Sequence, residues 1–126
     1  MEVLSSRILL RPHNFEISRI FYAEKLGLAI YREFGQGQIS GIVFFLGNGL
    51  LELSGQSDQA PNKIDLWLQV RDIDQMHQHL LQQGVQITQS PKLEPWGLKE
   101  MWIKDPDGIR IAVVEIPQEH PLRRRI

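Results

Sequence analysis

The feature that most constrains the fold of this chain is an internal repeat of one strand-and-helix pattern. Residues 7–28 alternate polar and apolar side chains, break at Pro12 and continue as an amphipathic helix ending at Gly27. Residues 65–87 repeat that order, and their helix ends at Gly84. Three further strand-like runs follow each copy. The sequence therefore predicts a βαβββ unit that is used twice.

The repeat also predicts how the chain is organised. We expect a single domain over residues 1–126, with a first module at about 5–55, a polar linker at 56–63, a second module at about 64–116 and a polar tail at 117–126. Asn14 and Asp72 are the expected helix N-caps. The buried helix positions are expected to be Ile17, Ile20 and Phe21 in one helix, and Ile73, Met76, Leu80 and Leu81 in the other. The expected strands are 7–11, 28–34, 40–46, 50–54, 65–70, 86–93, 98–104 and 109–116.

Composition excludes several classes of function. The chain has 126 residues, of which 42% are hydrophobic, which is enough for an ordinary core. It contains no cysteine, so disulfides, thiolate zinc sites and a cysteine nucleophile are excluded. The formal net charge is −1, and we expect neither a nucleic-acid nor a membrane partner. Arg123–Arg125 in the tail are interpreted as a solvated end, and the expected location is cytoplasmic.

Two motifs resemble those of a known superfamily. After the first strand, the helix has Ser18, Phe21 and Tyr22 followed by Leu26, Gly27 and Leu28, and residues 95–111 read PWGLKEMWIKDPDGIRI. Both resemble the glyoxalase, bleomycin-resistance and extradiol-dioxygenase (vicinal oxygen chelate) superfamily, from about residue 5 to 116. The likeness is greatest to its metal-free, bleomycin-resistance-like members.

This resemblance implies an α+β fold in which two curved mixed sheets face each other around a cleft, with the helices on the convex sides. It also implies a homodimer. Strand alternation then divides the side chains between two faces. The residues expected to pack against the helices are Leu51, Leu53, Leu66, Leu68, Ile111 and Val113. Those expected to line the cleft are Arg7, Leu9, Arg11, Glu52, Ser54, Asp65, Trp67, Gln69, Glu100, Trp102, Lys104, Arg110 and Ala112.

The metal-binding positions of the superfamily, carried over to this chain, hold an unsuitable set of side chains. They fall at Arg7, Glu52, Asp65 and Ala112, and only Glu52 is a usual ligand type. Arg7 has no free lone pair near neutral pH and Ala112 has no donor atom, although Asp65 could hold a hard cation through oxygen. We therefore expect no metal cofactor.

Arg7 suggests a physical substitute for the metal. Its guanidinium could bridge Glu52 and Asp65, which would otherwise repel each other. The alternative is that Arg7 simply reaches solvent at the start of its strand.

The three tryptophans are candidates for holding a planar ligand. Trp67 and Trp102 fall on the cleft side, and Trp96 lies in a Pro-Trp-Gly turn beside it. For Trp102, ligand contact and structural filling both remain open, whereas filling is favoured for Trp67. His77 and His79 diverge by roughly 200° on a helix, and we expect no catalytic residue.

Three functions remain open. The sequence favours a metal-free protein that holds a small, polar, partly planar organic molecule in the cleft between the modules. The alternatives are a metal-dependent glyoxalase-type lyase or dioxygenase-like enzyme with a non-standard divalent-metal site, and a structural or regulatory dimer. The expected ligand-binding residues are Arg7, Glu52, Asp65, Trp67, Trp96, Trp102 and Arg110.

Overall fold

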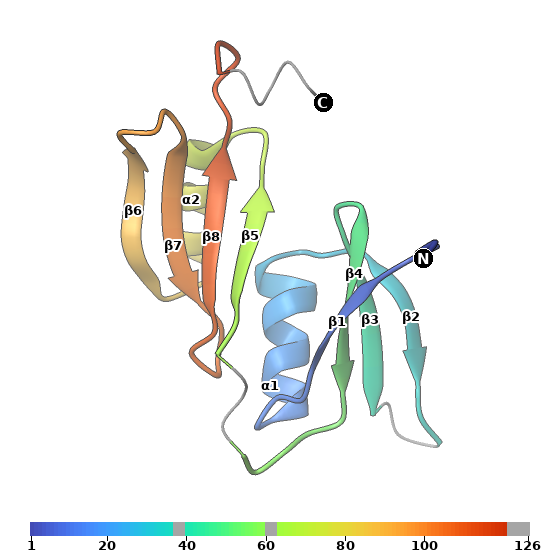
Figure 1. Cartoon of the computed structure of the whole chain (residues 1–126). Helices are drawn as coiled ribbons and strands as arrows, with labels where there is room; N and C mark the ends of the chain where they lie inside the picture. Colours follow the sequence, from blue (N-terminus) through green and yellow to red (C-terminus); the bar gives the residue numbers. More distant parts are fainter. Residues whose placement is uncertain (37–39, 60–62, 121–126) are drawn as a thin grey trace. The chain divides into compact units, whose positions relative to one another are not determined.

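The computed structural model describes residues 1–36, 40–59 and 63–120. Its contacts divide the chain into a first unit, Met1–Asn62, and a second unit, Lys63–Ile126. Each unit is a four-stranded sheet with helical structure on one side (Figure 1). Part of the expected linker, residues 60–62, and the arginines Arg123–Arg125 lie outside the described residues. Whether the two units form one domain stays a prediction.

In the first unit, one helical segment follows the first strand and three strands follow the helix. The α-helix leads directly into a π-helical turn. The elements are β1 (Arg7–Leu10), α1 (Phe15–Ile20), η1 (Phe21–Lys25), β2 (Ile30–Phe34), β3 (Gly41–Leu46) and β4 (Gly49–Ser54).

The second unit repeats this order with a longer helix. Its elements are β5 (Asp65–Gln69), α2 (Ile73–Gln82), β6 (Ile87–Leu93), β7 (Lys99–Lys104) and β8 (Arg110–Glu115). All eight predicted strands are present in the two units, with ends that differ from the predicted ones by no more than two residues.

The two sheets have the same topology. The strand orders are β1-β4-β3-β2 and β5-β8-β7-β6, so the first strand of each unit lies at an edge beside the last strand. That edge pair is parallel, and the other pairs are antiparallel. The predicted α+β fold, with two βαβββ units and mixed sheets, is confirmed.

Both helices begin as the sequence predicts. The side chain of Asn14 accepts a hydrogen bond from the backbone N–H of Ile17, and that of Asp72 accepts one from Gln75. Each cap satisfies one of the N–H groups that the first helical turn leaves without an internal partner.

Two expected buried positions are wrong, because Ile17 is 54% exposed and Leu81 is 52% exposed. In the first helix, η1 places one extra residue in the turn, and the N–H of Leu26 donates to the carbonyl of Phe21. Phe21 and Tyr22, at the start of this turn, are both buried, and their rings meet edge to face with centroids 5.0 Å apart.

The helix-facing strand positions form the core of each unit. Leu51 and Leu53 in β4 and Ile111 in β8 are fully buried, and Leu66 and Val113 are nearly so. Helix α1 contacts β4, and α2 contacts β6, β7 and β8. The alternation read from the sequence thus identifies the helix side of each sheet. Among the described residues, no helix is long and apolar enough to cross a membrane.

Candidate functional site

The candidate site residues lie on the sheet face opposite the helix, which we call the helix-free face. In the first unit this face carries Leu9, Glu52, Val43 and Arg32 as direct neighbours across four strands. A second row, one step along the strands, contains Ser54, Gly41 and Phe34. Glu52 is therefore at the middle of the face.

Both oxygens of the Glu52 carboxylate accept hydrogen bonds from its own unit. Arg7 Nη1 donates to Oε1 at 2.7 Å, and the hydroxyl of Ser54 donates to Oε2. These two contacts, with Ser54 the larger cause, hold the pKa of Glu52 below its usual range, and the charges of Arg7 and Arg32 add to the effect. The side chain is only 15% exposed. Glu52 is thus a half-buried carboxylate, and its neighbours favour the ionised form.

An aromatic ring covers another part of the first unit's face. A Cβ placed on Gly41 would lie 2.1 Å from the ring of Phe34, so this ring covers the glycine directly. The guanidinium carbon of Arg32 lies 5.4 Å from the centroid of the same ring. Val43, between these groups, is fully buried.

The helix-free face of the second unit carries different side chains in its rows. Asp65, Arg110 and Lys104 are direct neighbours in one row across β5, β8 and β7. The next row consists of Trp67, Ala112, Trp102 and Gln89. Charge is gathered in the first row and aromatic surface in the second.

Trp102 joins these two rows. The guanidinium carbon of Arg110 lies 4.5 Å from the centroid of its ring, and Arg110 Nη2 lies 3.7 Å from Asp65 Oδ2. Trp102 also packs against a buried apolar cluster of Leu98, Ala112, Val114 and Ile116. The indole is therefore held in place by packing on one side while it contacts a cation on another.

A shallow concavity of about 340 Å³ lies around this tryptophan. Its volume is at the lower end of the roughly 300–1,000 Å³ that is typical of small-molecule pockets. The strand register shifts between Ile87 and Gln89, which explains how two consecutive residues of β6 line the same space. The lining residues are Thr88, Gln89, Trp102, Lys104 and Arg110.

Trp96 belongs to a neighbouring polar contact. Its indole N–H donates to Glu100 Oε2 at 2.6 Å, and His120 Nε2 lies 3.1 Å from its backbone carbonyl oxygen. Glu100 is only 7% exposed, whereas Trp96 is 57% exposed. Trp96 thus provides a partner for a buried carboxylate and keeps much of its ring accessible.

The structure brings the expected site residues together in two groups, one in each unit. Arg7 contacts Glu52 in the first unit. In the second unit, Arg110 contacts Asp65 and Trp102. Trp67 is in the row of Trp102 but is 52% exposed, and Trp96 lies beside Glu100. The bridge from Arg7 to Asp65 and the position of a ligand between the modules stay predictions.

Sequence reasoning placed Ser54 and Lys104 on the correct face but did not select them as site residues. It missed Thr88, Gln89 and Arg32. Ser54 shares the strand parity of Glu52, two residues away, which was a usable signal. Gln89 and Thr88 line the concavity because the register of β6 is irregular, and no local sequence pattern predicts that irregularity.

Comparison with known proteins identifies the family of this chain. The model of the Glyoxalase/Bleomycin resistance protein/Dioxygenase superfamily matches residues 6–113. The chain belongs to this superfamily. No match was found among curated protein sequences.

Solved structures of several proteins share this fold. A member from Sphaerobacter thermophilus DSM 20745 is 23% identical, with a TM-score of 0.74 over 91% of this chain and 98% of that one. TioX from Micromonospora sp. ML1 is 15% identical, with a TM-score of 0.77 over 91% and 100%. A lactoylglutathione lyase from Agrobacterium tumefaciens is 18% identical, with a TM-score of 0.69 over 90% and 94%. At these identities the likeness establishes the fold alone.

The metal positions implied by the superfamily do not fit a metal in this chain. At the first of them Arg7 donates a hydrogen bond to Glu52, and at the fourth the methyl group of Ala112 is buried in an apolar cluster. Glu115, two residues after Val113 in β8, faces the helix, where it accepts a hydrogen bond from the backbone N–H of Ile73. Two of the four positions therefore have no atom that can coordinate a metal, and the Glu115 side chain is on the opposite face of the sheet.

Proposed function

We propose that this chain is a metal-independent binding protein for a small, polar, partly planar organic molecule. The observation that carries the proposal is the indole of Trp102, which is fixed by apolar packing beside Arg110 in a concavity of about 340 Å³. A rigid aromatic platform with a few polar groups around it is the usual composition of a small-molecule site.

The state of Glu52 supports binding rather than the glyoxalase-type alternative. That alternative needs a metal to polarise the substrate and a carboxylate to act as a base. Hydrogen bonds from Ser54 and Arg7 lower the pKa of Glu52, which makes it a weaker base. With Arg7 and Ala112 at two of the ligand positions, both parts of such a mechanism lack suitable groups.

Metal analysis of the purified, untagged protein tests the first half of the proposal. We expect no stoichiometric metal, and no thermal shift on titration with nickel, zinc, manganese or iron(II). The matched variant is Glu52→Ala. Stoichiometric metal that disappears in this variant would overturn metal independence and direct attention to lyase and dioxygenase assays.

Ligand screening tests the second half. Planar, polar compounds are titrated into the wild-type protein while the indole N–H signals are followed by NMR. We expect the signal of Trp102 to move, and Trp102→Leu to lose binding that Trp67→Leu keeps. If bound compounds perturb neither Trp102 nor its neighbours, the site proposed here is wrong.

We also propose that two copies of the chain form a homodimer, as the superfamily resemblance suggests. Sedimentation equilibrium of the full chain measures this directly. A mass near twice the 14.6 kDa of one chain is the expected result, and a single-chain mass at micromolar concentrations contradicts it.

A further inference from the structure

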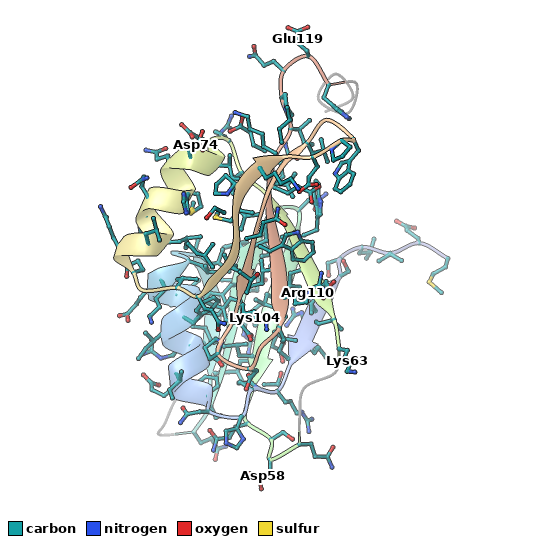
Figure 2. All side chains as sticks on the ribbon, turned by 90° about the vertical axis from the view of Figure 1, so that its left-hand side faces the viewer. Asp58, Lys63, Asp74, Lys104, Arg110 and Glu119 are labelled. Atoms are coloured by element: carbon teal, nitrogen blue, oxygen red, sulfur yellow. The ribbon has the colours of Figure 1, made fainter. Side chains whose placement is uncertain are left out.

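The lining of the concavity around Trp102 has an excess of positive charge, which the nearby side chains compensate only in part. Lys104 and Arg110 are directly opposite each other on β7 and β8, and like charges in such a pair destabilise a sheet. Figure 2 labels both side chains near one another on the second unit. Two adjacent cations on one face are most stable when an anion lies between them.

The nearby carboxylate neutralises this pair only weakly. Asp65 lies 3.7 Å from Arg110, and the two side chains are 53% and 57% exposed, a setting in which ion pairs contribute little. Among the described residues, no ion pair involves Lys104. A bound anion would therefore find a cation pair that is still largely available.

The neutral polar groups of the lining are already engaged by the protein. Gln89 Nε2 donates to Glu94 Oε1 at 3.1 Å and to the backbone carbonyl of Glu100 at 3.4 Å. The hydroxyl of Thr88 donates to the backbone carbonyl of Trp102 at 3.2 Å. The charged donors that the lining offers to a ligand are those of Arg110 and Lys104.

We propose that this site selects a planar organic carboxylate. Trp102 supplies the surface for the ring system, and Arg110 and Lys104 hold the carboxylate. A guanidinium stacked on an aromatic ring keeps N–H groups at its edge, and their geometry matches the two oxygens of a carboxylate. The volume of about 340 Å³ suits one or two fused rings. This inference rests on the proposed function and adds the charge and size class of the ligand.

A charge series of one ring system tests the selection. Naphthalene-2-carboxylate, its neutral amide and 2-naphthylmethylammonium are titrated into the full wild-type chain by isothermal calorimetry at constant ionic strength. We expect the carboxylate to bind about tenfold more tightly than the amide, as for a charge-assisted hydrogen-bonded pair. The ammonium compound is expected to bind most weakly, and acetate, which lacks the ring, to show no measurable binding.

Variants assign the selection to its residues. Arg110→Gln and Lys104→Gln should each reduce the preference for carboxylate over amide, and the double variant should abolish it. Lys99→Gln is the matched control, because Lys99 is on the same strand but on the other face, 3.9 Å from Glu115. Circular dichroism of each variant confirms that the fold is retained.

The outcomes separate the two proposals. If all three naphthyl compounds bind equally, the binding function stands and the carboxylate selection is overturned. If the carboxylate is preferred but the preference survives in the double variant, the selection belongs to another site and this assignment is wrong. If none of the three compounds binds, both the planar-ligand function at Trp102 and the inference built on it fail.

Discussion

The helix-free faces of the two units show how one topology can support different chemistry. At equivalent places in the two sheets, the first unit has the row Leu9, Glu52, Val43 and Arg32, and the second has Trp67, Ala112, Trp102 and Gln89. In the first unit a central carboxylate receives hydrogen bonds from Arg7 and Ser54.

In the second unit the central position is a small alanine between two tryptophans, and cations lie in the next row. On the first face the central carboxylate is thus satisfied internally, whereas on the second an aromatic ring and two cations line a shallow concavity, where we propose that a ligand binds. The difference arises from side chains alone, because strand order and pairing are the same. A repeat in sequence therefore predicts which positions of the two sheets are equivalent, but not that their side chains have the same chemistry.

The largest expected effect on stability is at the two tryptophans of the second face, and it should differ between them. Trp102→Ala removes a ring packed on Leu98 and Val114, and we expect a loss of about 2–3 kcal/mol in the free energy of unfolding. Trp67→Ala removes a ring that is 52% exposed and should cost less than about 1 kcal/mol. Urea denaturation measures both. Equal costs would mean that another part of the protein buries Trp67.

Opening the first face is the next test. Gly41→Ala would force the ring of Phe34 off the sheet, because the new Cβ would lie 2.1 Å from that ring. Since the ring end of a side chain can swing aside, we expect a loss of about 1 kcal/mol in the free energy of unfolding. The matched control is Gly49→Ala, where the nearest atom lies at 3.7 Å. A loss no greater than that of the control would show that Phe34 does not hold this face closed.

The titration of Glu52 measures how far the first face is internally satisfied. We expect Ser54→Ala and Arg7→Gln each to raise its pKa, since the hydrogen bonds from Ser54 and Arg7 and the charge of Arg7 all lower it. Carbon-13 NMR of the Glu52 carboxyl measures the pKa directly. Arg11→Gln is the control, because Arg11 is not among the groups that shift Glu52.

The same shift makes part of the stability dependent on pH. A lowered folded-state pKa contributes stability that is fully present above the usual carboxyl range and is lost as the pH falls through the folded-state pKa. The wild-type protein and Arg7→Gln should therefore differ most in stability at neutral pH and converge in acid. A difference in the free energy of unfolding that is constant with pH would contradict this account.

The smallest expected effect is a gain of metal binding in the first unit. Arg7→His removes the guanidinium from Glu52 and adds an imidazole beside it, so we expect weak binding of nickel or zinc. Arg7→Gln removes the same contact without adding a ligand and serves as the control. Calorimetric titration compares the two, and equal metal affinity would argue against Arg7 standing in place of a cation.

Much of the fold was predictable because it depends on local patterns. Alternation over residues 65–69 identified both the strand and its buried Leu66, and the acidic residue Asp72 marked the start of the helix. Ile17 was wrong because the buried side of the first helix contains Phe15 and Ser18, and Leu81 was wrong because the buried side of α2 contains Ile73 and Leu80.

The candidate site was less predictable because its contacts are not local. Alternation alone placed Glu52, Trp102 and Arg110 on one side of their strands. It could not show that Ser54 would engage Glu52, or that Gln89 would donate both N–H groups to protein acceptors. Hydrogen-bond partners depend on distances within the folded unit, which strand parity does not contain.

The sequence by itself determined the two βαβββ units, the helix ends and the side of each strand that is buried, because these follow from periodicity and capping within short segments. Only the tertiary structure decided which side chains meet across the sheets. Arg110 lies over Trp102, and Phe34 covers Gly41, because the strand order and the register bring them together. Register is set by packing and by strand irregularities along whole strands, so the chemistry of each face becomes visible only after folding.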